Sequence, residues 1–207
     1  MIADDAWRFD APVWSPDGKR LLYAADRDGK TVLQQVDLAT NAATALTAAT
    51  DASQFAPTFS PSGDQIAFTE QEAERSQIVL INRLSNQTAL YLIKPDGTQL
   101  ERLTHGMGDA SMPRWSSDGQ STAFLRQDAG ERSARLHLIR LADRTERQLA
   151  DALVLGEPFA WSPDDAFIAF IAPYRSLFTA LSIVRVSDGR VFQVVQGGQL
   201  SQLAWAD

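Results

Sequence analysis

The stretch Trp14-Ser15-Pro16-Asp17-Gly18, WSPDG, decides the fold, because near-copies of it return along the chain. The four copies read PVWSPDGKRLLYAA from Pro12, PTFSPSGDQIAFTE from Pro57, PRWSSDGQSTAFLR from Pro113 and FAWSPDDAFIAFIA from Phe159. A turn motif that occurs four times between similar apolar segments indicates an internal repeat. An internal repeat has to be interpreted before any other feature.

The aromatic residue before each turn sets the length of the repeat. These aromatics are Trp14, Phe59, Trp115 and Trp161, with successive spacings of 45, 56 and 46 residues. A four-stranded propeller blade takes about 40 to 45 residues. Trp205 follows Trp161 by 44 residues, so the chain also contains the start of a fifth repeat.

Each copy predicts the same four strands. A short apolar strand ends at the aromatic, a Ser-Pro-Asp-Gly turn reverses the chain, and a second apolar strand follows. Proline presets φ, aspartate bonds back to the backbone, and glycine accepts positive φ. A third strand alternates, as in LYLIKPDG (residues 90–97), and a second tight turn leads to a fourth. No segment has a helical period, so we predict an all-β β-propeller of four-stranded antiparallel blades.

The repeats predict one propeller domain over residues 1–207. We expect four complete blades near residues 11–50, 51–107, 108–153 and 154–198, and the first strand of a further blade in residues 199–207. Two arrangements fit this count: an arc of a larger propeller, or a self-contained four-blade ring with extra terminal strands. An open arc would expose two apolar blade faces and would favour self-association.

The repeated residues are interpreted as structural. One blade cannot cover both of its own faces, so we expect the four aromatics to fill the spaces between neighbouring blades. The structural set is Trp14, Pro16, Asp17, Gly18, Phe59, Pro61, Gly63, Trp115, Asp118, Gly119, Trp161, Pro163 and Asp164. Ser117 replaces the turn proline in the third copy and Asp165 the glycine in the fourth, so we expect those turns to be less regular.

Composition restricts the function classes. With 44% hydrophobic residues and no long apolar run, we expect a soluble globular chain without membrane insertion. The N-terminal MIADDAWRFD does not resemble a signal peptide. A formal net charge of -7 argues against a general nucleic-acid binder, which needs a basic face. The absence of cysteine excludes disulfides and thiolate metal sites from the chain.

The motifs for catalysis and cofactor binding are missing from the sequence. A serine hydrolase would show Gly-x-Ser-x-Gly with a histidine partner later in the chain, and this pattern is absent from the sequence. His105 and His137 are the two histidines, and we expect them to be hydrogen-bonded or solvated. DRDGKT (residues 26–31) lacks the later ligands of a calcium loop. We therefore expect no catalytic residue, no metal site and no cofactor.

The SPDG turns, together with LYLIKPDGTQLERLT (residues 90–104), resemble the TolB-like, WD-like β-propeller repeat family. The resemblance covers residues 11–207, and the second copy is the nearest match to the family's repeat. It implies a bacterial, non-catalytic platform for protein–protein interaction in a periplasmic or extracellular location. Similar repeats also form the propeller that precedes the hydrolase domain of prolyl-oligopeptidase-like serine peptidases.

Propeller geometry predicts where a binding site would lie. Loops that join second to third strands, and loops that join blades, meet on the rim opposite the SPDG turns, which we call the loop rim. Its candidate partner-binding residues are Asp26, Arg27, Asp28, Glu72, Glu74, Arg75, His105, Asp109, Arg126, Asp128, Tyr174 and Arg175. Gln127 and the blade-joining residues Asp51, Gln54 and Glu157 lie on the same rim. An insertion near residues 71–87 enlarges one of these loops.

The mixed charge of the loop rim fits recognition of a protein partner, but a solvated rim without a partner would have the same composition. The main hypothesis is a non-catalytic scaffold for protein–protein interaction. One alternative is the substrate-gating propeller of a larger serine peptidase whose catalytic domain is not in this chain. A small-ligand-binding or sugar-binding propeller fits less well, because the rim has few aromatic residues.

Overall fold

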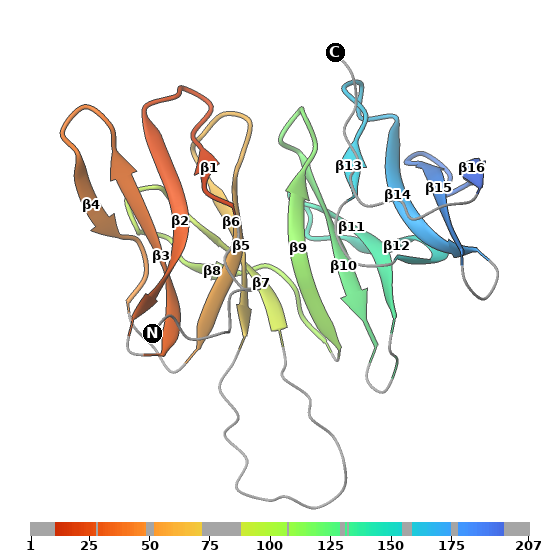
Figure 1. Ribbon diagram of the computed structural model, residues 1–207, viewed down its shortest axis with the longest axis horizontal. Helices are drawn as coiled ribbons and strands as arrows, with labels where there is room; N and C mark the ends of the chain where they lie inside the picture. Colours follow the sequence, from red (N-terminus) through yellow and green to blue (C-terminus); the bar gives the residue numbers. More distant parts are fainter. Residues whose placement is uncertain are drawn as a thin grey trace, which may run out of the picture. The chain divides into compact units, whose positions relative to one another are not determined.

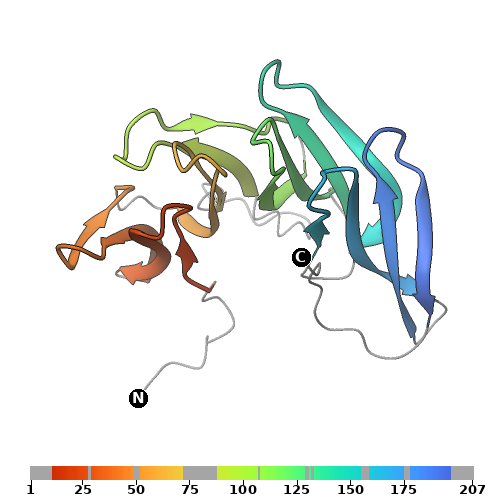
Figure 2. The same cartoon turned by 90° about the horizontal axis from the view of Figure 1, so that it is seen from above.

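The computed structural model describes residues 11–27, 29–48, 52–71, 88–106, 108–128, 131, 133–154, 159–174 and 178–196. In this part of the chain, sixteen strands form four four-stranded antiparallel sheets, shown in Figure 1. Within each sheet the strands lie side by side in sequence order (Figure 2). The predicted all-β fold of four-stranded units is confirmed. The described residues contain no helix that is long and apolar enough to cross a membrane.

The sheets match the four repeats. Sheet 1 has β1 (Val13–Trp14), β2 (Arg20–Arg27), β3 (Lys30–Asp37) and β4 (Ala42–Ala45). Sheet 2 has β5 (Ser53–Phe59), β6 (Ile66–Gln71), β7 (Thr88–Ile93) and β8 (Glu101–Arg102). Sheet 3 has β9 (Asp109–Trp115), β10 (Ser121–Gln127), β11 (Ala134–Arg140) and β12 (Glu146–Val154). Sheet 4 has β13 (Ala160–Trp161), β14 (Phe167–Tyr174), β15 (Phe178–Arg185) and β16 (Val191–Gln196).

The chain divides into two compact units, residues 1–113 and 114–207, with β9 crossing the boundary. The core of the first unit lies between the facing sides of sheets 1 and 2. Its buried residues are Leu22, Ala24, Leu33 and Leu46 from the sheet 1 repeat and Phe59, Ile66, Phe68 and Ile93 from the sheet 2 repeat. Each sheet therefore buries a face that it could not cover by itself.

Two of the repeat aromatics join neighbouring sheets within a unit, as predicted. Phe59 is 6% exposed and lies in the core between sheets 1 and 2, where the Arg20 guanidinium is 5.4 Å from its ring centre. In the second unit, the Trp161 indole of sheet 4 donates a hydrogen bond of 3.0 Å to the carbonyl of Arg114. Trp115 is also buried.

Trp14 corrects the prediction that all four aromatics are buried, since 59% of its surface is exposed. Phe59 and Trp161 each contact the repeat that precedes their own in the sequence. Sheet 1 belongs to the first repeat, and no earlier sheet exists among the described residues. The sequence motif is the same at Trp14, but the neighbour that buries such a side chain is missing from that part of the structure.

The four SPDG-type turns share one hydrogen-bond pattern that is built around a buried serine. In the first turn, the Ser15 hydroxyl accepts from the N–H of Arg20 at 2.9 Å and donates to Asp17 Oδ1 at 2.5 Å. The Gly18 N–H donates to the Ser15 carbonyl. Ser60, Ser116 and Ser162 make the corresponding bonds in the other three turns. The serine therefore closes the hairpin at its base.

The expectation that the third and fourth turns would be less regular is wrong. Asp165 adopts the left-handed conformation of the glycine that it replaces, with φ of 56°, and its N–H bonds to the Ser162 carbonyl at 3.0 Å. Its carboxylate accepts from the Ser117 N–H at 2.8 Å and from the Ser117 hydroxyl at 2.7 Å. A proline at position 117 would have no N–H to donate. The two departures from the motif therefore compensate for each other.

The equivalent positions in the first unit are Pro16 and Gly63, where a Cβ on Gly63 would lie 3.3 Å from Pro16 Cδ. Ser117 and Asp165 should therefore be energetically coupled. We expect the Ser117→Pro/Asp165→Gly double variant to be more stable than the sum of the two single variants predicts, by about 0.5 to 1 kcal/mol. Chemical denaturation of the four proteins measures this coupling. Strictly additive energies would show that the two turns do not interact.

Candidate functional site

In the first unit, the structure brings blade-joining segments next to the loops between second and third strands. The Gln54 N–H at the start of β5 donates to the Thr31 hydroxyl at the start of β3, at 3.0 Å. The Thr88 N–H at the start of β7 donates to Asp109 Oδ1 at the start of β9, at 2.7 Å. The two classes of loop that were predicted to form the loop rim thus lie on the same edge of these sheets.

Gln54 was predicted to lie on the loop rim, but it is only 2% exposed and is part of a buried polar network. Its side-chain carbonyl accepts from the Thr47 hydroxyl, and its amide donates to Glu70 Oε2 at 2.9 Å. Thr47 in turn accepts from the Leu33 N–H at 3.2 Å. These bonds satisfy buried polar atoms between sheets 1 and 2, so Gln54 is a structural residue.

The other predicted rim residues fall into three groups. Asp26, His105 and Asp128 are exposed, and Asp109 is half-buried with its carboxylate on Thr88. The backbones of Arg27 and Tyr174 end strands β2 and β14, but their side chains are not described. The residues outside the described part are Asp28, Asp51, Glu72, Glu74, Arg75, Glu157 and Arg175, together with most of the 71–87 insertion and the predicted strand at 199–207.

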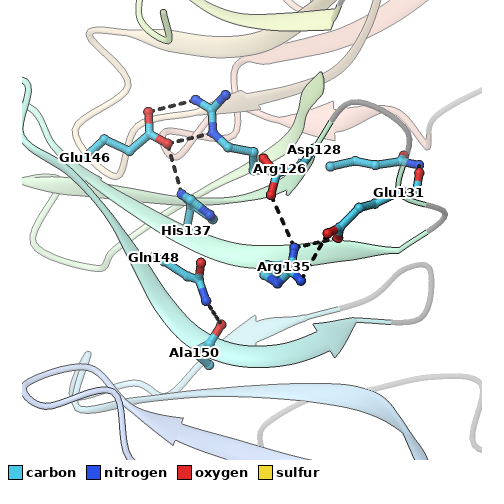
Figure 3. A network of polar contacts seen from close by, with 9 residues as sticks. Arg126, Asp128, Glu131, Arg135, His137, Glu146, Gln148 and Ala150 are labelled. Carbon is cyan, nitrogen blue, oxygen red and sulfur yellow. Dashed lines mark hydrogen bonds and ion pairs between the residues drawn. The ribbon is translucent and has the colours of Figure 1, made fainter. Parts of the chain in front are cut away.

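Arg126 does not lie on the surface of the loop rim as predicted. It is 8% exposed and lies on the same face of sheet 3 as the buried Phe124, with its guanidinium 5.5 Å from the ring centre of Phe124. Its guanidinium binds both oxygens of Glu146 on β12, at 2.7 and 2.8 Å. His137 on β11 completes the group with Nδ1 at 2.9 Å from Glu146 Oε1, as Figure 3 shows. Three neighbouring strands are thus linked by one carboxylate.

Glu146 is the centre of this charged group and is ionised. Burial disfavours the charged form, but hydrogen bonds from His137 and Arg126 outweigh it and lower the pKa of Glu146 below its ordinary value of 4.5. Because a carboxylate only accepts, His137 donates from Nδ1. An arginine that binds a carboxylate through two parallel bonds holds a fixed geometry. The arrangement links three strands of sheet 3 and keeps the Arg126 side chain buried.

A second charged group lies on the loop between β10 and β11, at the loop rim of the second unit. Arg135 Nη1 is 2.6 Å from Glu131 Oε2 and 3.3 Å from Asp128 Oδ2. Figure 3 shows the three side chains gathered where the two strands meet the loop. The side chains of Asp128 and Glu131 are 59% and 41% exposed, so their oxygens also face solvent. This group is the described part of the candidate site in the second unit, and Asp26 and His105 are exposed candidate residues of the first unit.

Three residues of these two groups were not predicted from the sequence: Glu131, Arg135 and Glu146. His137 was expected to be hydrogen-bonded or solvated, but its contact with Glu146 was not predicted. Glu131 and Arg135 are four residues apart around a short loop, a spacing from which a contact could have been inferred. Glu146 carries no such signal. Its partners lie 20 and 9 residues earlier in the chain, and only strand register brings them together.

The charged group around Glu146 predicts a pH-dependent stability. Glu146→Gln keeps the shape of the side chain but leaves Arg126 buried without its counter-charge. We expect a loss of about 2 kcal/mol at pH 7, less than for a fully buried pair, because the Glu146 side chain keeps 24% exposure. Since the folded pKa of Glu146 is lowered, this contribution is present above about pH 4.5 and is lost as the pH falls through the folded pKa.

Denaturant unfolding of the wild type and of Glu146→Gln between pH 7 and pH 3 measures this difference. The difference in free energy of unfolding between the two proteins should become smaller as the pH falls. Asp26→Asn, a change of an exposed carboxylate on β2, is the control and should give a small, nearly constant difference. A Glu146→Gln effect that is independent of pH would contradict an ionised, paired Glu146.

Comparisons with known proteins agree with this geometry. The chain is 29% identical over 122 residues to the uncharacterized protein Atu1656 of Agrobacterium fabrum, an alignment that covers 58% of this chain and 40% of that protein. The structure superimposes on the crystal structure of TolB from Acinetobacter baumannii with a TM-score of 0.68 and 22% identity, covering 90% of this chain and 43% of that chain. The chain thus spans less than half the length of these relatives.

A puromycin-hydrolyzing peptidase from Mycobacterium tuberculosis gives a TM-score of 0.63 with 14% identity, over 89% of this chain and 28% of that chain. This likeness shows the fold alone. The family described as TolB beta propeller domain matches residues 3–207, nearly the whole chain. With its four SPDG-closed sheets, the chain belongs to the TolB beta propeller domain family.

Proposed function

We propose that this chain is a non-catalytic β-propeller scaffold that binds another protein through its loop rim. The single observation that carries the proposal is the Asp128–Glu131–Arg135 group, in which charged side chains are held by mutual contacts while two carboxylates still face solvent. Side chains that are already ordered lose little conformational entropy on binding. Arginine is also favoured at protein interfaces.

Family membership supports a scaffold. The repeated residues that define the family serve the turns and the sheet-to-sheet contacts, as Ser15, Phe59 and Trp161 show. Recognition is therefore left to loops, whose residues differ from repeat to repeat. We further propose that the four sheets are blades of a single propeller domain, and that the protein is bacterial and works in the periplasm or outside the cell, as the family resemblance implies.

A second candidate function rests on the likeness to the mycobacterial peptidase. In this alternative, the chain is the substrate-gating propeller of a larger serine peptidase, and catalysis resides in another part of the polypeptide. The likeness covers 28% of the peptidase chain, so it concerns only a part of that enzyme. An immunoblot of native cells with an antibody to this chain, combined with a peptidase assay on the captured polypeptide, distinguishes the two functions.

The rim proposal predicts where a partner cross-links. A photoreactive phenylalanine analogue placed at His105 or Asp128 should give discrete cross-links to another protein in cells. The same residue placed at Lys19 or Ser62, which are exposed at the SPDG-turn end of the sheets, is the matched control and should give none. Immunoblots after irradiation measure the cross-links.

Equal cross-linking from both ends of the sheets would contradict recognition through the loop rim. Hydrolysis of peptides or esters by the purified chain would contradict a non-catalytic scaffold. The hydrolysis assay needs a parallel preparation from cells without the coding sequence, so that a contaminating enzyme is recognised.

A further inference from the structure

Two outer turns of the second unit form one continuous surface at the SPDG-turn end of the sheets. One turn joins β11 to β12 and the other joins β15 to β16. The Arg147 guanidinium donates to the Val186 carbonyl, and a Cβ on Gly189 would lie only 2.5 Å from the Leu149 carbonyl oxygen. The Leu141 N–H bonds to the Gln120 carbonyl beside the third SPDG-type turn, which places this surface at the opposite end of sheet 3 from the loop rim.

This surface, which we call the arginine corner, is positively charged. Residues 140–147 and 185–190 contain five arginines (Arg140, Arg144, Arg147, Arg185 and Arg190) against Asp143, Glu146 and Asp188, a net charge of +2. The equivalent segments of the first unit, residues 37–42 and 94–101, contain Lys94 against Asp37, Asp96 and Glu101, a net charge of -2. The corner is therefore a local feature of a chain whose total charge is -7.

Strand register shows that the difference in charge between the two units occurs at equivalent positions. Leu138 pairs with Arg147 in sheet 3, whereas Leu92 at the corresponding place in sheet 2 pairs with Glu101. Two repeats with the same backbone pattern thus present opposite charges at the same position. Since the fold does not need an arginine there, the arginine corner points to a function of its own.

Two of these arginines lie against Phe192, the second residue of β16. The guanidinium groups of Arg185 and Arg190 each lie 5.2 Å from the ring centre of Phe192, a cation–π arrangement. Arg185 also pairs with Asp188 at 3.2 Å. The positive charge is therefore positioned beside the strand.

Among the described strands, β16 lies at the outer edge of sheet 4 and pairs with β15. Three of its valines are exposed: Val191 by 39%, Val194 by 52% and Val195 by 47%. An edge strand presents unpaired N–H and C=O groups to which an extended chain can bond. Apolar side chains that stay exposed on such an edge mark a contact surface.

A bulge restricts what can pair with this edge. Ser182 pairs with Gln193 and Leu181 with Val195, so Val194 is an extra residue in the ladder. A bulge bends its strand, and bulges and charges on an edge hinder pairing between copies of a protein. A short segment with negative charge avoids both obstacles, because it needs only a few ladder bonds and its charge is complementary to the arginine corner.

We propose that β16 and the arginine corner bind an extended acidic segment of a partner protein by β-strand addition. Acidic side chains of the segment contact Arg185 and Arg190, and its β-branched side chains lie beside the exposed valines. Main-chain bonds supply affinity, and the arginine corner selects the charge of the segment. This surface is separate from the loop rim, so the inference does not depend on the proposed function.

The test uses a fluorescein-labelled peptide, Glu-Val-Glu-Val-Glu-Val-Glu, titrated with the whole chain and followed by anisotropy. We expect binding that weakens with added salt, and no binding of the peptide in which lysine replaces glutamate. Arg190→Glu should weaken binding about tenfold. Lys94→Glu, the same charge change on an outer turn of the first unit, is the matched control and should leave binding unchanged.

Two further measurements test the strand pairing itself. Hydrogen exchange of the Val191–Gln196 amides should slow when the peptide binds. Val194→Ser should weaken binding, whereas Leu100→Ser, a change of another exposed apolar residue, should not. Thermal unfolding of each variant confirms that it is folded.

Several results would overturn the inference: no binding of the acidic peptide, equal binding by Arg190→Glu, or unchanged exchange along β16. Binding to vesicles that contain phosphatidylserine without binding to the peptide would assign the arginine corner to a lipid surface instead. Sedimentation that shows dimers dissociated by Val194→Ser would assign β16 to contacts between copies of the chain.

Discussion

A four-stranded sheet has two faces and cannot shield both from water, and this constraint governs the whole structure. In the first unit it is met by packing sheet 1 against sheet 2, with Leu22, Leu33 and Phe68 removed from solvent completely. A single sheet would leave in water the apolar face that it presents to its neighbour. The repeat of the sequence follows from the same constraint, because every sheet must offer its neighbour a matching apolar face.

Once stacking is required, the hairpin at the inner edge of each sheet has to be closed in the same way. The buried serine does this with one hydroxyl that both donates and accepts, as at Ser15 and Ser116. The aspartate can move within the motif: Asp64 lies two positions after Ser62 and still receives the hydrogen bond of Ser60. The four turns share the same type of hydrogen bonds, although their amino-acid sequences differ.

Equivalent positions in the repeated sheets carry different side chains and make different contacts. Tyr91 in sheet 2 stacks on Phe68, whereas the equivalent His137 in sheet 3 lies beside Phe124 and bonds to Glu146. One sheet fills the position with an aromatic contact and the other with a charged one. Positions that point outward vary more freely still, so sheets with one backbone pattern carry surfaces of different charge.

The all-β architecture, the four sheets and their turns could be predicted from the sequence, because alternation and turn chemistry are local and were repeated four times. The loop rim could be predicted only as a set of loops. Arg126 and Gln54 were placed there by chain position, yet both are buried, since each side chain bonds to a carboxylate on another strand of its own sheet. Trp14 shares its motif with Phe59 and Trp161 but is exposed, because burial depends on the neighbouring sheet and not on the residue itself. The sequence by itself determined the repeating unit, and only the tertiary structure decided which copies of a residue are buried, paired or exposed, because those states depend on contacts between residues far apart in the chain.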